Sequence, residues 1–255
     1  MSLHHVESVM GTTISIDLID SHDRTLIADL VRWFHHVDAE FSPYKDESTI
    51  TLIGRGELAP SDHAVSDDVR AVLQRCGELN EESDGVFDVW SLPSPNGTRF
   101  DPCGYVKGWS VERGARFLRE HGVRDFCINA GGDVVVEGFA RGGAPWRVGI
   151  RHPDDPMGLA LVLQVEGPRG IATSGSYERG AHIFDPRRGE PSTALASATV
   201  IGPDLAEADA FATIVYVMGV DGLHWLADRP GYSGCVITSD LQMLSTDDFD
   251  QYVAN

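Results

Sequence analysis

An acid and a hydroxyl stand near the start of an otherwise apolar segment, AEADAFATIVYVMG, at residues 206–219. Asp209 and Thr213 are four residues apart, so in a helix their side chains lie on the same face. A carboxylate and a hydroxyl placed in this way suit an oxygen-preferring cation such as Mg²⁺, which also keeps water or phosphate oxygens as ligands. The same residues can instead serve the helix, with Asp209 paired to its dipole and Thr213 bonded to the preceding turn. The residues alone support the two interpretations equally.

A second group of polar residues lies in FDPCGYVKGWSVERG, at residues 100–114. We expect a helix to begin near Gly104, which places Asp101 close to its N-terminus and Lys107 one turn further on. The N-terminus of a helix attracts anions and a lysine adds positive charge, so this stretch is suited to bind a phosphate. The alternative is structural, with Asp101 as a helix cap and Lys107 as a surface charge.

A third polar stretch, TSGSYERGAHIFDPRRGEP, spans residues 173–191 and is predicted to be mainly loop. It contains hydroxyls, the imidazole of His182 and the carboxylate of Asp185, which are residue types that catalysis uses. His182 also lies beside Ile183 and Phe184, so a buried structural histidine is an equally supported interpretation.

Several familiar motifs are absent from the chain. It has no GxGxxG motif after a strand, no GxxxxGK[ST] motif and no HExxH motif. A Rossmann dinucleotide fold is therefore not expected. The stretch TSGSYE lacks the GxSxG pattern, which leaves a serine hydrolase only as a minor alternative.

The charge and the composition exclude several classes of protein. The net charge of −19 at pH 7 opposes binding of nucleic acid or of an anionic membrane through a basic surface. A phosphate-bearing ligand would need a local cation, a helix N-terminus or a metal ion. We expect no stable membrane insertion, because we find no apolar run that approaches about 20 residues. The N-terminus lacks signal-peptide features, which predicts a cytoplasmic protein, and the four scattered cysteines are expected to be reduced.

Hydrophobic spacing predicts blocks of helices and strands rather than strict alternation. A hairpin is expected around Met10-Gly11-Thr12 and another around Ser239-Asp240, and residues 91–98 are expected to form a loop. This pattern predicts an α+β fold, and without a compositional linker we expect one domain over residues 1–255. The helices are expected at about residues 23–40, 66–83, 104–121 and 205–218, and the remaining strands at about 125–130, 133–138, 146–151, 160–167, 170–174 and 194–202.

Seven segments of the chain, taken in order, resemble the FAD:protein FMN transferases of the ApbE family. Each segment is modest alone, but the seven in this order are specific, and they span Val9 to Gly219. The resemblance implies a single ApbE-like (T-fold-like) α+β domain with mainly antiparallel sheets and packed helices. The segments are VMGTTISI, FSPYKDEST, GVFDV, DPCGYVKGWSVERG, NAGGDVVVEG, TSGSYERGAHIFDPRRGEP and ADAFATIVYVMG.

The resemblance also implies an activity. FAD is the substrate, Mg²⁺ is required, and FMN passes to a threonine hydroxyl of a target protein while AMP leaves. The acceptor would carry a D-G-x-T-G-[AST]-like motif, which this chain lacks, so self-modification is not expected. Two alternatives stay open: a Mg²⁺-dependent FAD pyrophosphatase that uses water as the acceptor, and a non-catalytic FAD-binding protein.

Site residues follow from the same resemblance. His182 is a candidate general base, with Asp185 as its possible orienting partner and a carboxylate as the alternative base; Asp209 is also expected to be catalytic. The residues implied to bind FAD are Met10, Tyr44, Val86, Phe87, Asp88, Asp101, Lys107 and His182. The residues implied to hold the metal are Gly104 through its carbonyl, Asp209, Thr213 and the carbonyl of Ala212.

The chain departs from the family pattern at Pro102 and in the short loop from Tyr177 to His182. Pro102 stands where a small or aliphatic residue is more usual, which bears on how the carbonyls near Gly104 point. The short loop bears on the surface that receives the target. Many relatives carry an export or lipoprotein signal and none is visible here, so we expect a cytoplasmic or cytoplasm-facing acceptor.

Overall fold

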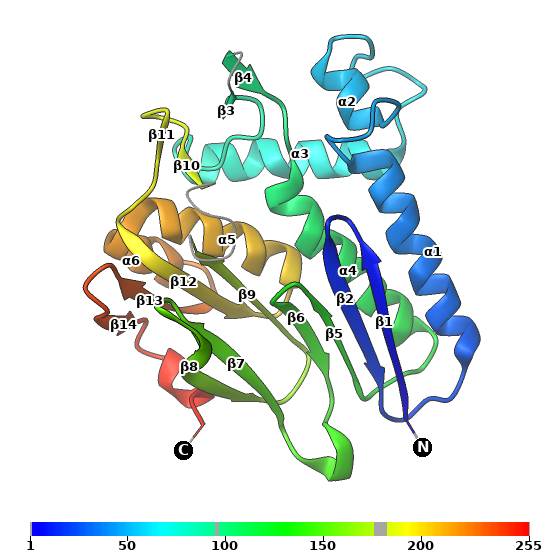
Figure 1. Ribbon diagram of the computed structural model, residues 1–255, viewed down its shortest axis with the longest axis vertical. Helices are drawn as coiled ribbons and strands as arrows, with labels where there is room; N and C mark the ends of the chain where they lie inside the picture. Colours follow the sequence, from blue (N-terminus) through cyan, green and yellow to red (C-terminus); the bar gives the residue numbers. More distant parts are fainter. Residues whose placement is uncertain (1, 95–96, 176–182, 255) are drawn as a thin grey trace.

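The computed structural model of the protein describes residues 2–94, 97–175 and 183–254, and its centre is an eight-stranded antiparallel sheet (Figure 1). Each strand in the order pairs antiparallel with its neighbours. The strand order is β1 (Leu3–Val9), β2 (Thr12–Leu18), β5 (Phe126–Ala130), β6 (Asp133–Glu137), β9 (Arg169–Gly175), β12 (Leu195–Gly202), β13 (Ser233–Thr238) and β14 (Met243–Ser245).

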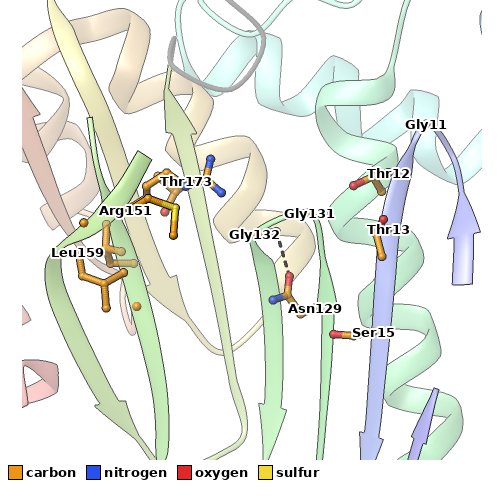
Figure 2. A pocket seen from close by; sticks show the side chains of 14 residues that line it. Gly11, Thr12, Thr13, Ser15, Asn129, Gly131, Gly132, Arg151, Leu159 and Thr173 are labelled. Atoms are coloured by element: carbon orange, nitrogen blue, oxygen red, sulfur yellow. Dashed lines mark hydrogen bonds between the residues drawn. The ribbon is translucent and has the colours of Figure 1, made fainter. Parts of the chain in front are cut away.

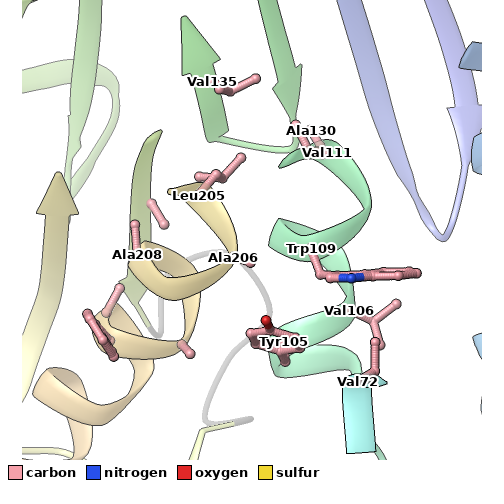
Figure 3. Close-up of a cluster of buried hydrophobic side chains, with 14 of the residues drawn as sticks. Val72, Tyr105, Val106, Trp109, Val111, Ala130, Val135, Leu205, Ala206 and Ala208 are labelled. Atoms are coloured by element: carbon pink, nitrogen blue, oxygen red, sulfur yellow. The ribbon is translucent and has the colours of Figure 1, made fainter. Parts of the chain in front are cut away.

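Helices cover one face of this sheet and form the larger hydrophobic core with it (Figures 1 and 3). Within this layer α4 packs against α5, and α5 lies on β9 and β12. Val135 of β6 and Ala172 of β9 belong to this core. The helices are α1 (Arg24–Phe41), α2 (Thr49–Gly54), α3 (Asp67–Glu82), α4 (Cys103–Glu120), α5 (Leu205–Met218) and α6 (Gly222–Ala227).

A long hairpin, β7 (Trp146–His152) and β8 (Asp155–Val165), covers part of the other face. Val134 and Ile171 point to this side and pack in a second, smaller core with Ile150 and Leu163 of the hairpin. Successive residues of a strand point to opposite faces, so β6 and β9 contribute to both cores. The single-turn 3₁₀ elements are η1 (Arg141–Gly143), η2 (Gly219–Asp221) and η3 (Phe249–Tyr252).

The expected α+β fold is confirmed, and so are the four long helices and both hairpins. The expected loop at residues 91–98 is wrong, because β3 (Leu92–Ser94) and β4 (Gly97–Arg99) pair there. The sequence analysis also did not predict α2, α6 or the strand pair β10 (Phe184–Asp185) and β11 (Glu190–Pro191). These elements are too short for hydrophobic periodicity; α2, for example, depends on Ser48, which caps it at the amide of Thr51.

One expectation about membranes needs correction. The segment Leu205–Ala227 is long and apolar enough, by composition alone, to cross a membrane. In the fold 61% of the apolar 18-residue window within that segment is buried. Its apolar character is explained by α5, which packs against α4, α6 and the sheet and is therefore apolar nearly all round.

A glycine lets α4 and α5 approach closely. A Cβ atom at Gly108 would lie 2.8 Å from Cβ of Asp209 and 2.8 Å from the carbonyl oxygen of Leu205. A carboxylate oxygen of Glu112 on α4 also accepts a hydrogen bond from the amide of Leu205, at 3.1 Å. The backbones of the two helices are thus held together at the start of α5.

We expect Gly108→Ala to destabilise the fold by about 1–3 kcal/mol, because the added methyl group has no space between the helices. Gly77 of α3 is the matched control, since a Cβ there meets nothing within 4 Å. Gly77→Ala should stabilise the protein by about 0.5–1 kcal/mol through helix propensity. Urea unfolding of the three proteins measures both values, and equal stabilities would contradict the close-packing argument.

Candidate functional site

The carboxylate of Asp209 lies in the interior where α4 meets α5. It is 5% exposed, and its Oδ2 accepts a hydrogen bond from the amide of Gly108 at 3.0 Å. The helix-dipole interpretation of Asp209 is wrong, because Asp204 caps α5 and Glu207 is the acid of its first turn. Asp209 lies further along the helix and faces the interior.

A second buried carboxylate, Asp133, lies beside Asp209 and was not predicted. Asp133 begins β6, is 1% exposed and forms an ion pair with the ammonium group of Lys107. Oδ2 of Asp133 contacts Nζ of Lys107, but this oxygen accepts no hydrogen bond from the described residues. Charge attraction therefore holds the pair together. The surface-charge interpretation of Lys107 is therefore wrong. The signal that could have revealed Asp133 is an acid at the start of the apolar strand DVVVEG.

Two buried carboxyl groups, those of Asp133 and Asp209, lie beside the ammonium group of Lys107. Burial raises the pKa of the Asp209 carboxyl, and the charge of Asp133 raises it further. Lys107 and the amide of Gly108 act in the opposite direction. Two buried carboxylates with a single ammonium group are a costly arrangement unless a further cation joins them.

The oxygen groups expected to join Asp209 as metal ligands lie on α4 and α5. The hydroxyl of Thr213 lies 3.1 Å from the hydroxyl of Ser174 on β9, in a hydrogen bond between helix and sheet. In an α-helix the amide of Gly108 points toward the carbonyl of Gly104, so that carbonyl lies on the side of Asp209. Ala212 is fully buried next to Thr213.

No cluster of three or more His, Cys, Asp or Glu side chains forms a metal site within residues 2–94, 97–175 and 183–254. A metal ion here would therefore need hydroxyl, carbonyl, water or substrate oxygens besides the carboxylates. This donor set fits Mg²⁺, which keeps several waters and phosphate oxygens, better than it fits Zn²⁺.

The residues expected at the phosphate side have structural contacts. Asp101 is buried; it accepts a hydrogen bond from the amide of Cys103 at 3.0 Å and pairs with Arg99 at 3.1 Å. Asp101 is therefore not the N-cap of α4, as the structural alternative expected; it stands one residue before the cap and accepts from the amide of the first helical residue. Pro102 stands at the N-cap position of α4, and the helix begins at Cys103, one residue before the predicted start.

The residues expected around the flavin differ in burial. Val86 and Phe87 are buried in the core, and a Cβ at Gly104 would lie 3.6 Å from the ring of Phe87. Asp88 is half-buried and accepts from the amide of Trp90 at 2.7 Å. Core packing is therefore confirmed as a role of Val86 and Phe87, and their ring or methyl faces are not broadly open to a ligand.

Met10 and Tyr44 are the more accessible members of this group. Met10 lies in the β1–β2 turn, where its sulfur is 3.9 Å from the hydroxyl of Ser110 on α4. Tyr44 follows α1 and is 81% exposed, so core packing does not explain it. Trp90 is a further aromatic residue that was not predicted; it is 47% exposed and stacks on Phe100 with ring centroids 4.2 Å apart.

The candidate base and its partner are only partly placed. His182 lies outside the described residues. Asp185 is buried and accepts from Nε and Nη2 of Arg187, each at 2.9 Å. These hydrogen bonds hold the pKa of Asp185 below its usual value. Both oxygens of Asp185 are thus occupied by an arginine.

Comparison with known proteins decides the family. The sequence profile of the ApbE family matches residues 10–96 and 89–236. The chain belongs to the ApbE family.

Curated relatives of this ApbE family member are FAD:protein FMN transferases. The protein of Vibrio cholerae serotype O1 is 26% identical over 273 residues, covering 85% of this chain and 81% of that protein. A Klebsiella pneumoniae protein is 32% identical over 199 residues, covering 71% and 59%. The Escherichia coli K12 protein is 33% identical, and the match spans 52% of this chain and 41% of the relative.

Solved structures of the family share the fold. The flavin transferase ApbE from Vibrio cholerae matches with a TM-score of 0.85 at 23% identity, over 99% of both chains. The ApbE protein from Thermotoga maritima matches with a TM-score of 0.85 at 21% identity, over 100% of both chains.

We expect Mg²⁺ to raise the Tm of the wild-type protein by a few degrees, because a cation bound only to the folded state stabilises it. Asp209→Asn should lose this response, while its Tm without Mg²⁺ stays equal or rises because a buried charge is removed. The measurement is thermal unfolding with Mg²⁺ and with EDTA.

Glu112 provides the control, because it is also 5% exposed but already binds Arg119 and the amide of Leu205. Glu112→Gln should keep the Mg²⁺ response. If Asp209→Asn and the wild type respond equally, Asp209 is not a metal ligand.

Proposed function

We propose that this ApbE family member is an FAD:protein FMN transferase that uses Mg²⁺ and passes FMN to a threonine hydroxyl of another protein. The observation that carries the proposal is the buried pair Asp209 and Asp133, which lies beside the ammonium group of Lys107. Such a site attracts a cation and, with it, a pyrophosphate. The names of the curated relatives supply the substrate and the direction of transfer.

Asp209, Thr213 and the carbonyl of Gly104 are the groups that would hold the metal, with the carbonyl of Ala212 as a further candidate. When bound, Mg²⁺ neutralises charge on the pyrophosphate and on the departing AMP. This charge neutralisation offsets the repulsion between an acidic protein and an anionic substrate.

The chain's own residues bind and orient the substrate. Lys107 places a positive charge on a phosphate oxygen, and Asp133 fixes the position of that ammonium group. Met10, Tyr44 and Asp88 are proposed to contact the flavin. Asp101 holds the first turn of α4, and thereby the carbonyl of Gly104, in place.

In the transfer step the acceptor oxygen forms a bond to the phosphorus of the FMN half. The bond from that phosphorus to the bridging oxygen breaks, and AMP leaves with this oxygen. The hydroxyl proton goes to a base, for which we propose His182, because imidazole accepts protons near neutral pH.

The direct test is to mix the protein with FAD, Mg²⁺ and an acceptor protein tagged with a D-G-x-T-G-[AST] segment. We expect the acceptor mass to rise by one FMN unit, with one AMP released per transfer. A tag with valine in place of threonine is the control. AMP and free FMN formed regardless of the tag would indicate a pyrophosphatase, and intact FAD in every reaction would indicate a flavin-binding protein.

Asp209→Ala should abolish this turnover while the protein stays folded, because Asp209 is not the cap of α5. Glu112→Gln is again the matched control and should keep most of the activity. Turnover at the wild-type rate in Asp209→Ala would refute the proposed role of this carboxylate.

His182→Ala should slow transfer by roughly 10²–10⁴-fold if the imidazole accepts the hydroxyl proton. The loss should appear in kcat rather than in the affinity for FAD. Single-turnover kinetics together with FAD binding separate the two effects, and an unchanged rate would leave a carboxylate as the base.

A further inference from the structure

A groove of about 740 Å³ lies between the β1–β2 and β5–β6 turns on one side and the tip of the β7–β8 hairpin on the other (Figure 2). Glycine and hydroxyl residues line much of it. Among the described residues that line it one is charged, Arg151, and this side chain already has an interaction within the protein. Charge therefore does not indicate what this groove binds.

A smaller groove, of about 410 Å³, lies between β1 at the edge of the sheet and α1 (Figure 1). Four of the eight described residues that line it are arginine or histidine and none is acidic, in a chain whose net charge is −19. We call it the β1–α1 groove. Its walls are Leu3, His4 and His5 of β1 and the residues of α1 from Arg24 to Arg32 that face them.

The wall formed by α1 has an apolar floor and a cationic rim. Ile27 is buried and Val31 is half-buried, one turn apart on the inner side of the groove. Arg24, Ala28 and Arg32 are exposed and spaced four residues apart, so they form a row along the helix. The small Ala28 leaves space between the two arginines, whose Cα atoms lie about 12 Å apart along the helix axis.

The two arginines can bind an anion. Arg24 has no ion pair or side-chain hydrogen bond with the residues that the structure describes, and the neighbouring carboxylate of Asp23 caps α1 at the amide of Thr25. Arg32 is 73% exposed and pairs with Asp29 of the same helix. Such an exposed pair contributes little and can be exchanged for another carboxylate. The two histidines already contact carboxylates of the β1–β2 hairpin, so the arginines supply the charge.

The outer edge of β1 offers backbone hydrogen bonds. Among the described strands β1 pairs only with β2. The amide of Gly131 donates to the carbonyl of Thr13, so Thr13 faces β5, and by alternation Ser15 and Asp17 face β5 as well. Residues opposite them on β1 direct their backbone groups away from β2. The residues of β1 whose N–H and C=O groups point to the outer edge are therefore His4, Val6 and Ser8.

The spacing of the groove indicates the sequence of a strand that would fit it. Alternate side chains of a strand added to β1 lie over α1, and four residues of an extended chain span about 13 Å. Two acidic residues four positions apart on that face would therefore reach Arg24 and Arg32. An apolar side chain midway between them would lie over Ala28. The groove thus fits an extended segment with the pattern acid–x–apolar–x–acid.

We propose that the β1–α1 groove is a docking site for another protein, which adds an extended acid–x–apolar–x–acid segment to the outer edge of β1. Backbone hydrogen bonds to β1 supply affinity, while the side chains that face α1 supply specificity. The two carboxylates of the segment bind Arg24 and Arg32. This inference goes beyond the proposed function, because it depends on neither FAD nor Mg²⁺.

Peptide binding to the whole protein tests the site. The probe is a fluorescein-labelled nonapeptide with the core Glu-Thr-Val-Thr-Glu, and its Kd is measured by anisotropy. The matched control has the core Glu-Thr-Val-Glu, in which the second acid lies on the opposite face of the strand. We expect the control to bind at least about fivefold more weakly. Equal affinities, or no saturable binding of the probe up to about 1 mM, would overturn the inference.

Charge reversal tests the role of the arginines. Arg24→Glu should weaken binding of the probe by roughly 5- to 10-fold, and an acid is well tolerated in the first turn of a helix. Arg116→Glu changes an exposed arginine of α4 outside the groove and should alter the Kd less than about twofold. A probe with lysine in place of both glutamates should bind the double variant Arg24→Glu/Arg32→Glu better than the wild type. A general loss of stability would not produce this exchange, and its absence would contradict the assigned charges.

Two exposed alanines of α1 provide a steric test. Ala28→Trp fills the space between the arginines and should weaken binding of the probe by about tenfold or more. Ala39→Trp adds the same side chain to the same helix outside the groove and should have little effect. Equal Kd values for these two variants would place the peptide elsewhere on the protein.

Hydrogen exchange locates the backbone contact. In the presence of saturating probe, the amides of His4, Val6 and Ser8 should exchange about tenfold more slowly, because they become hydrogen-bonded to the added strand. The amides of β14, at the opposite edge of the sheet, should be unchanged. Binding of the probe without protection of the three β1 amides would overturn the proposed strand addition.

Discussion

The close approach of α4 to α5 is the constraint on which the rest of the site depends. Because residue 108 has no side chain, its amide reaches the carboxylate of Asp209 directly. The same approach places Lys107, one residue earlier, against Asp133 at the start of β6. Glu112 and Arg119 extend this contact by joining α4 to the first turn of α5 and to Glu137 of β6. Helix packing and site chemistry are therefore set by one interface.

The charges at this interface are not explained by stability. Replacing a buried ion pair by apolar residues is often neutral or stabilising, and an additional buried carboxylate adds a further cost. The pKa of Asp209 is raised because its charged form is disfavoured in the protein alone. A cation together with a phosphate would supply the missing positive charge and use Lys107 as well. Ligand binding therefore accounts for an arrangement that folding alone would disfavour.

Long elements and the helix face shared by Asp209 and Thr213 could be predicted because their signals are local. The spacing of Asp209 and Thr213 places them on one helix face, and hydrophobic periodicity locates α1, α3, α4 and α5. Asp133 was missed because its role depends on Lys107 and Asp209, which are brought to it only by the pairing of distant segments. The structural roles of Asp101 and of Asp185 were likewise decided by arginines whose positions depend on short turns. Signals that need tertiary contacts are not visible in residue spacing.

Access of water to the reacting phosphorus decides between transfer and hydrolysis. Both reactions place an oxygen nucleophile on the same phosphorus, so the outcome depends on whether water or the acceptor hydroxyl reaches it first. In this fold Asp209 and Asp133 are buried between the helix layer and the sheet. An acceptor segment bound at the site would exclude water at the moment its own hydroxyl arrives. Binding of the acceptor would then select the transfer reaction, without any further group being needed in the site.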